Sequence, residues 1–218
     1  MSAASRVYIE TGNKRAFACS LEWPGLARSG KTEDAALATL ASYVPRYSPV
    51  AARAGVTFDL SDDEQWRVVE RVPTRSGGAD FGVPTTVLAS DSGDLGAGEA
   101  SRTAALLSAS WEFLDEIAAG APPELRKGPR GGGRDRDAVV DHVAAAEQLF
   151  GLKVGFKLPV PAPGDRDVVV ANRAAILEWC QSGKERPEAR EGWPPRYAAR
   201  RLIWHVLDHA WEIEDRRR

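Results

Sequence analysis

The chain has 218 residues, of which 43% are hydrophobic and 28% are charged, and its formal net charge is −2. These proportions are ordinary for a globular protein in water, and the length allows one large domain or two small ones. The near-neutral balance argues against nucleic acid or an anionic membrane as a partner, and no apolar run reaches the roughly 18 residues of a membrane span.

The N-terminal part of the chain has the pattern of an α+β domain. Runs in which large apolar residues alternate with small or polar ones, or in which β-branched residues gather, predict strands at residues 6–10, 15–23, 56–60, 66–72 and 83–88. Thr32 is placed to cap a helix over residues 33–44, whose first turn is acidic. Pro45 and Pro49 are expected to end that helix.

The composition changes after residue 89. Residues 90–98 are small, polar and rich in glycine, which suits a linker. Four amphipathic segments of similar length follow and predict helices at residues 99–119, 134–150, 165–182 and 195–216. Four such helices, joined by Gly- and Pro-rich connections, favour a four-helix bundle. The expected fold class is therefore α+β in two domains, an α+β domain over residues 1–95 and a helical bundle over residues 96–218.

The three histidines of the chain carry its clearest functional signal. His205 and His209 are four residues apart in the last predicted helix, so their side chains share one face. These two and His142, in the second bundle helix, lie on or beside the apolar stripes of their helices and are expected to point inward. Three imidazoles with an open position form the ligand set of catalytic zinc. A histidine on an apolar face is also commonly a hydrogen-bonded core residue, so that alternative stays open.

Several acidic residues lie near these histidines in the sequence. Glu147, Asp208 and Glu212 are close enough to accept the second ring N–H of a ligating histidine. Asp208 and Glu212 could equally pair with neighbouring arginines. No Ser, Cys or Glu stands out as a general base, and Glu147 and Glu212 are the two candidates for that catalytic role.

The segment 125–137, which precedes the second bundle helix, is rich in Gly and Arg. Arg130 and Arg134 in this segment would hold the carboxylate of a substrate or of a thiol cofactor, helped by the dipole of the helix that follows. The alternative is a flexible, solvated loop. No aromatic residues interleave with these arginines, which argues against RNA. The terminal arginines, residues 216–218, are expected to be a solvated helix end.

Residues 25–32, GLARSGKT, match the phosphate-binding loop pattern letter for letter. Such a loop follows a buried parallel strand with a continuous apolar run, whereas the run before Gly25 alternates. No later apolar strand ends in the Asp that would hold magnesium. We therefore expect turn glycines here and no nucleotide.

The C-terminal half resembles the DinB/YfiT-like superfamily of four-helix-bundle metalloproteins. The resemblance rests on HVAAAE at His142 and on the late H-x-x-x-H pair in WHVLDHAWEIEDR, and it covers residues 98–218. It implies a divalent metal, zinc or nickel above all, held by His142, His205 and His209. Characterised members include thiol-dependent S-transferases and an isomerase, so a low-molecular-weight thiol is an implied cofactor. Residues 211–214 depart from the common pattern, so the substrate is not carried over.

The N-terminal part is similar to HicB-like domains in the segment FACSLEWPGLARSGKTEDAALATL. Those domains have two strands, a Pro-Gly turn and a helix that opens with Thr and acidic residues. They act as antitoxins that bind a small RNase toxin, often through a chain that continues into a DNA-binding region. Because a helical bundle follows here, the resemblance implies a domain that binds a protein partner or a small ligand.

Two functions follow from these patterns. The first is a metal-dependent transferase or hydrolase, in which the metal activates water or a thiol toward a small-molecule substrate. The second is a non-enzymatic interaction or regulatory protein with a structural histidine cluster. Cys19 and Cys180 are far apart and are expected to be buried free thiols, which together with the absence of a signal-peptide pattern points to the cytoplasm. The sequence leaves a homodimer open.

Overall fold

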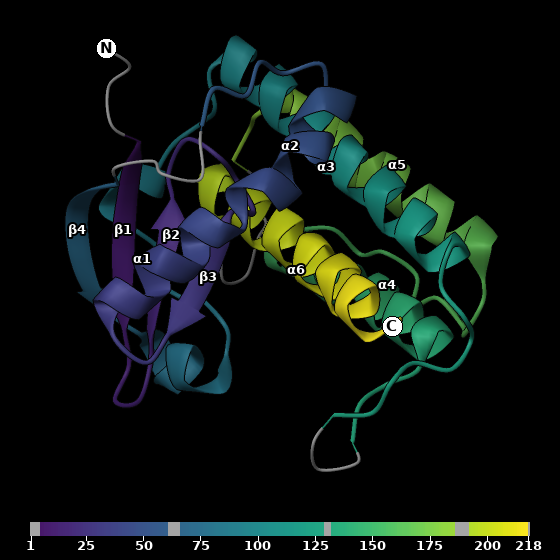
Figure 1. Ribbon diagram of the computed structural model, residues 1–218. Coiled ribbons are helices and arrows are strands. Elements are labelled where there is room, and N and C mark those ends of the chain that lie inside the picture. Colours follow the sequence, from purple (N-terminus) through teal and green to yellow (C-terminus); the bar gives the residue numbers. More distant parts are fainter. Residues whose placement is uncertain (1–4, 61–65, 129–131, 186–191, 218) are drawn as a thin grey trace. The chain divides into compact units, whose positions relative to one another are not determined.

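The computed structural model describes residues 5–60, 66–128, 132–185 and 192–217. The chain forms two compact units, Met1–Ala89 and Ser90–Arg218 (Figure 1). The first unit is α+β and the second is helical, which confirms the expected fold class. No helix among the described residues is long and apolar enough to cross a membrane.

The N-terminal unit is built on a mixed four-stranded sheet. Its strands are β1 (Arg6–Thr11), β2 (Ala16–Ser20), β3 (Ala27–Gly30) and β4 (Arg67–Pro73), in the order β3-β2-β1-β4. The first three strands pair antiparallel, and β4 pairs parallel with β1. The expected strands near residues 6–10, 15–23 and 66–72 are thus confirmed with shifted ends.

Two short helices follow β3. Helix α1 (Glu33–Ser42) begins where expected, because the Thr32 hydroxyl accepts a hydrogen bond from the Ala35 N–H at 3.2 Å. Helix α2 (Val44–Arg53) then begins after a single residue, with Pro45 in its first turn and Pro49 in its interior. The first helix does end just before Pro45, as expected, but the expectation that Pro45 and Pro49 stop helical structure was wrong, because both lie in α2. Pro45 lies in a first turn, where its missing N–H is not needed.

Two expected strands, at residues 56–60 and 83–88, are absent from the sheet. In the first segment, Phe58 packs its ring 4.6 Å from that of Trp23 and 5.5 Å from that of Tyr47. In the second, the backbone N–H groups of Thr85 and Thr86 donate to the Glu10 carboxylate, which is 0% exposed. Their apolar pattern therefore reflects packing against the core of this unit, without pairing to a strand.

Strand β3 was not expected, and it occupies the centre of the GLARSGKT segment. Its residues form a ladder with β2, so this segment is a strand and not a loop around a phosphate. A Cβ atom on Gly30 would lie 2.3 Å from the Ala36 nitrogen, so the glycine permits close contact between β3 and α1. This contact gives a structural reason for the second glycine of the phosphate-loop pattern.

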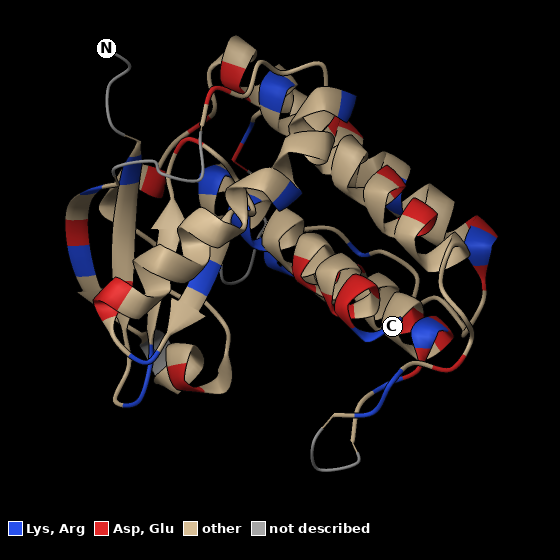
Figure 2. Cartoon of the chain, in the orientation of Figure 1, with Lys and Arg blue, Asp and Glu red and all other residues tan. Residues whose placement is uncertain are grey.

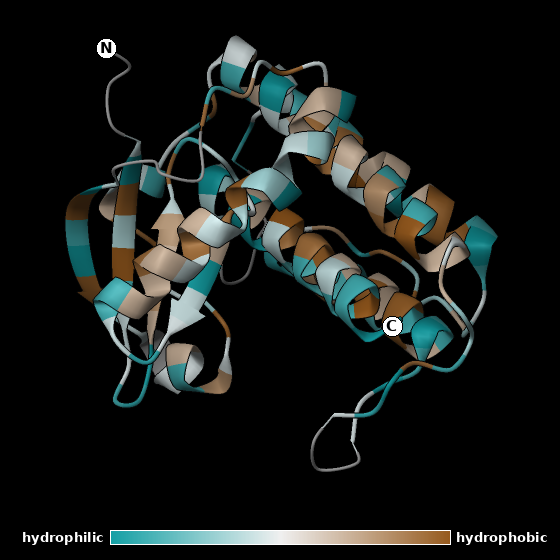
Figure 3. Cartoon of the chain, in the orientation of Figure 1, coloured by the Kyte–Doolittle hydropathy of each residue, from teal (hydrophilic) through white to brown (hydrophobic). Residues whose placement is uncertain are grey.

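The C-terminal unit consists of four long helices that pack together. They are α3 (Ala97–Ala119), α4 (Arg136–Lys153), α5 (Arg166–Ser182) and α6 (Pro195–Arg216), each within three residues of its expected bounds. Hydrophobic and hydrophilic residues alternate along these helices (Figure 3), and acidic and basic residues are interspersed on them (Figure 2). The fully buried side chains at their centre include Leu106, Leu107, Leu114, Ile176, Leu202, Ile203, Leu207 and Trp211.

Candidate metal centre

The three histidines of the chain converge between α4 and α6. The ring centroid of His142, on α4, lies 5.2 Å from that of His205 and 4.9 Å from that of His209, both on α6. The two rings on α6 are 4.6 Å apart. Each histidine offers one ligand nitrogen, and these three nitrogens lie within 4.8 Å of one another. The sequence prediction that the imidazoles face a common point is reproduced in this geometry.

Local helix geometry explains this convergence. His205 and His209 are one turn apart on α6, so their side chains project from one face. Helices α4 and α6 pack against each other, which brings His142 opposite that pair. Tetrahedral zinc, with bonds of about 2.0–2.1 Å, separates its ligand atoms by about 3.4 Å. Ring rotations that move these nitrogens by about 1 Å would therefore be enough to hold a metal.

The environment keeps two of these imidazoles neutral, which is the form that binds metal. Burial lowers the pKa of His205 to about 2, and the neighbouring charges of His209, Arg201 and His142 act in the same direction. Burial also lowers the pKa of His142. His205 is only 8% exposed, and its Nδ1 atom has no hydrogen-bond partner among the described residues. A buried imidazole with an unsatisfied nitrogen fits a site that binds an ion.

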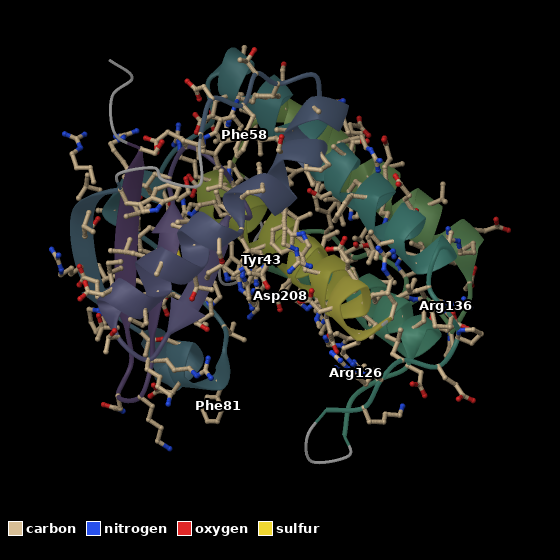
Figure 4. All side chains as sticks on the ribbon, viewed as in Figure 1. Tyr43, Phe58, Phe81, Arg126, Arg136 and Asp208 are labelled. Atoms are coloured by element: carbon tan, nitrogen blue, oxygen red, sulfur yellow. The ribbon has the colours of Figure 1, made fainter. Side chains whose placement is uncertain are left out.

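Glu212 supports the third histidine. Its Oε2 atom lies 2.8 Å from Nδ1 of His209, and the hydrogen bond to His209 lowers the pKa of the Glu212 carboxyl. This contact leaves Nε2 of His209 available to a metal, and it matches the carboxylate partner that ligating histidines usually have. Asp208, the other nearby acid on α6, is half-buried and is labelled in Figure 4.

Glu147 has its partners on the other side of α4. Its carboxylate accepts hydrogen bonds from the Trp111 indole of α3 at 2.7 Å and from the Arg173 guanidinium of α5 at 3.0 Å. Glu147 is 1% exposed, and burial raises its pKa, an effect that Arg173 and Trp111 oppose. Both carboxylate oxygens are thus engaged in joining three helices, and the hydrogen bonds described for Glu147 do not include a histidine.

The arginine-rich loop before α4 is tied to the end of α6. Arg216 donates to Glu212 at 2.5 Å and to the carbonyl oxygens of Arg126 and Arg134 at 2.9 Å and 2.7 Å. Arg126, a residue of this loop that is labelled in Figure 4, donates in turn to the carbonyl of Asp215. The described part of the loop is therefore anchored next to the carboxylate that holds His209.

Arg134 belongs to this anchored loop, whereas Arg130 lies outside the described residues. The Arg134 side chain is exposed, and its charge contributes to the lowered pKa of both His142 and His205. Its guanidinium is thus close enough to the histidines to influence them. Among the two candidate anion ligands, Arg134 is the one that the structure relates to the histidine cluster.

Arg216 was expected to be solvated, and this expectation was wrong. Its side chain is only 13% exposed because three acceptors surround the guanidinium. The i, i+4 spacing from Glu212 was the sequence signal that could have identified part of this role. The carbonyl acceptors of the loop carry no such signal, because they are about 80 to 90 residues away.

A separate cavity of about 550 Å³ lies between the end of α3 and the starts of α4 and α5. Its lining includes Asp115, Arg136, Asp141 and Arg166, and none of the three histidines. Several of these charged groups are already paired, as Arg136 is with Asp137 and Arg166 with Asp115. This cavity is therefore distinct from the candidate metal centre.

No protein-family model, curated protein or solved structure matches the chain. The findings that bear on function are therefore the ones in the structure itself: a mixed four-stranded sheet in one unit, and four packed helices with a three-histidine cluster in the other. That cluster could hold a metal ion.

Proposed function

We propose that the C-terminal unit is a metal-dependent enzyme of the DinB-like type, in which His142, His205 and His209 hold a divalent metal, zinc or nickel. The observation that carries the proposal is the convergence of three imidazole nitrogens, within 4.8 Å, from two separate helices. The resemblance of residues 98–218 to DinB/YfiT-like proteins supports the same ligand set. The reaction we infer is thiol S-transfer or hydrolysis on a small-molecule substrate.

A divalent metal bound by three histidines supplies a Lewis acid and lowers the pKa of bound water or thiol toward neutrality. The chain's own residues prepare for this chemistry. Burial favours the unprotonated forms of His142 and His205, and the contact of Glu212 with Nδ1 of His209 leaves Nε2 available as the ligand atom. Arg134 would bind an anionic group of the substrate or of a thiol cofactor. A base role for Glu212 is part of this proposal, whereas the contacts of Glu147 with Trp111 and Arg173 favour a packing role for Glu147 over a base role.

For the N-terminal unit we propose a HicB-like domain that binds a protein partner or a small ligand. The order β1-β2-β3-α1 and the Thr32 cap support this proposal, since the resemblance rests on strands followed by a Thr-opened helix. The boundary near residue 95 that the sequence favours lies within six residues of the division between the compact units.

Metal content tests the proposed function. The full-length protein purified without chelator is expected to contain about one zinc or nickel ion per chain by elemental analysis. His205→Ala should lose nearly all of it, because two imidazoles bind a divalent ion much more weakly than three. Gln148→Ala is the control, since this buried α4 residue hydrogen-bonds the Leu158 carbonyl and should keep its metal.

Two results would count against this function. One is a metal-free protein that takes up no zinc or nickel on dialysis, and the other is a His205→Ala variant with its metal intact. Metal-free protein that His205→Ala destabilises would favour the interaction protein, in which the histidine cluster is structural.

A further inference from the structure

A group of aromatic rings adjoins His205. Phe150, near the end of α4, has its ring centroid 5.4 Å from that of His205, in an edge-to-face arrangement. Trp193, just before α6, lies 5.3 Å from Phe150, and Tyr197 lies 4.9 Å from Trp193. These residues come from two chain segments that meet beside the histidine cluster.

The Phe150 and Trp193 rings are not core residues, unlike the buried Trp204, whose ring centroid lies 6.3 Å from that of His205. Phe150 and Trp193 are both half-buried, whereas the tryptophans within the helices, such as Trp179 and Trp211, are at most 6% exposed. The backbone N–H of Trp193 donates to the Lys153 carbonyl at 3.1 Å, which fixes the segment before α6 against the end of α4. Phe150 and Trp193 therefore form a partly open aromatic surface that is held in place.

We propose that Phe150 and Trp193 form the wall of the substrate site, and that the substrate carries an aromatic or flat apolar group which packs against them. This inference rests on the proposed function, because the group must belong to a molecule whose polar end reaches the metal. Phe150 contacts His205 directly and Trp193 contacts Phe150, so a small molecule bound at the metal can extend along both rings.

The chemistry of this surface favours a ring over a flexible aliphatic chain. Aromatic rings pair in offset or edge-to-face geometry at 4.5–7 Å and gain more affinity than the burial of their area alone supplies. The Arg201 guanidinium lies over the Phe150 ring, 5.4 Å from its centroid, which adds a positive charge beside this surface. An electron-rich ring or one bearing an anionic group would gain from that charge.

Two hydroxamates that differ in one phenyl group test the proposal. Both acetohydroxamate and benzohydroxamate chelate a divalent metal, but only benzohydroxamate presents a ring. We would load the full-length protein with cobalt(II) and follow the visible absorption of the metal during titration with each compound. Benzohydroxamate is expected to bind about tenfold more tightly, the equivalent of ~1.4 kcal/mol.

Variants assign this preference to the two rings. Phe150→Ala and Trp193→Ala should each reduce the preference for benzohydroxamate to about twofold while leaving acetohydroxamate affinity nearly unchanged. Leu149→Ala is the matched control, because Leu149 neighbours Phe150 on α4 but is 57% exposed. If an alanine variant unfolds, Phe150→Leu keeps apolar volume without a ring and should show the same loss of preference.

The outcomes separate this inference from the proposed function. Absence of cobalt binding by the wild-type protein overturns both. If the protein binds cobalt but has equal affinity for the two hydroxamates, or binds neither of them, the aromatic wall is overturned and the metal centre stands. A phenyl preference that persists in both ring variants also overturns it, since the preference would then arise elsewhere.

Discussion

At the scale of single residues, two glutamates near the histidines have different partners. Glu212 contacts His209 at 2.8 Å and is partly exposed, whereas Glu147 is buried and contacts Trp111 and Arg173. Both were candidates for the same role, because each lies within five residues of a histidine. Helix geometry separates them, since five residues turn Glu147 well away from the face of His142.

Replacing each glutamate by glutamine should therefore have different effects. Glu212→Gln removes the charge that polarises His209, and metal affinity should fall about 10–100-fold with little change in stability. Glu147→Gln removes the nearer carboxylate of the Arg173 guanidinium, which is 11% exposed and keeps Asp115 at 3.5 Å, and should cost about 3 kcal/mol of unfolding free energy. Competitive chelator titration measures the first quantity, and urea unfolding of the metal-free protein measures the second.

Glu112→Gln provides the control for both measurements, because Glu112 is an exposed α3 carboxylate whose contact is with Ser108. Glu112→Gln should alter neither the metal affinity nor the free energy of unfolding. A Glu147→Gln variant of normal stability but with weakened metal binding would show that Glu147 acts at the metal centre. The assignment of Glu147 to helix packing would then be wrong.

At the scale of helices and strands, sequence prediction is accurate where the determining interactions are between residues close in the chain, and it fails where they are between distant residues. The four long helices were predicted within three residues of their bounds, because amphipathic periods and Gly- or Pro-rich connections are local signals. The pair His205 and His209 was predicted for the same reason. The position of His142 opposite them required the packing of α4 on α6, which the bundle pattern and the DinB-like resemblance indicated.

The N-terminal unit shows where local signals fail. The ARSG sequence of β3 contains no β-branched or aromatic residue, and it becomes a strand because β2 pairs with it. The segment at residues 83–88 has strand-like residues, yet the buried carboxylate of Glu10, about 75 residues away, binds its N–H groups. Neither outcome could be predicted from a window of neighbouring residues.

Gly30 tests the contact between β3 and α1. In Gly30→Ala the new methyl group would meet the backbone of Ala35 and Ala36 at 2.4 Å and 2.3 Å, and backbone atoms cannot rotate aside. We expect a loss of about 2–3 kcal/mol in the unfolding free energy of the N-terminal unit. Hydrogen exchange of peptides from β2 and β3, measured at increasing denaturant concentration, would give this loss of unfolding free energy.

Gly98→Ala is the matched control for this substitution. A Cβ atom at Gly98 meets nothing within 4 Å, and the residue lies in the first turn of α3, where alanine is the better helix former. It should leave stability unchanged or raise it by up to about 1 kcal/mol. If Gly30→Ala behaved in the same way, the close contact between β3 and α1 would not be what requires a glycine.

At the scale of the whole molecule, the proposed functions divide between the two compact units. All three histidines, Glu212 and the aromatic residues beside His205 belong to Ser90–Arg218, whereas the HicB-like resemblance belongs to Met1–Ala89. A ligand stabilises the structure that binds it and leaves an independent unit unaffected. Metal should therefore act on the stability of only one unit.

Calorimetry of the full-length protein tests this division. With free zinc at about 100 times its dissociation constant, the binding unit gains about 2.7 kcal/mol, which should raise the Tm of one transition by roughly 10 °C. Gly30→Ala identifies the other transition by lowering its Tm in the presence or absence of metal. In His205→Ala the metal-dependent shift should disappear. A single transition that moves as a whole with both metal and Gly30→Ala would contradict the division, because it would mean that the two units unfold as one cooperative structure.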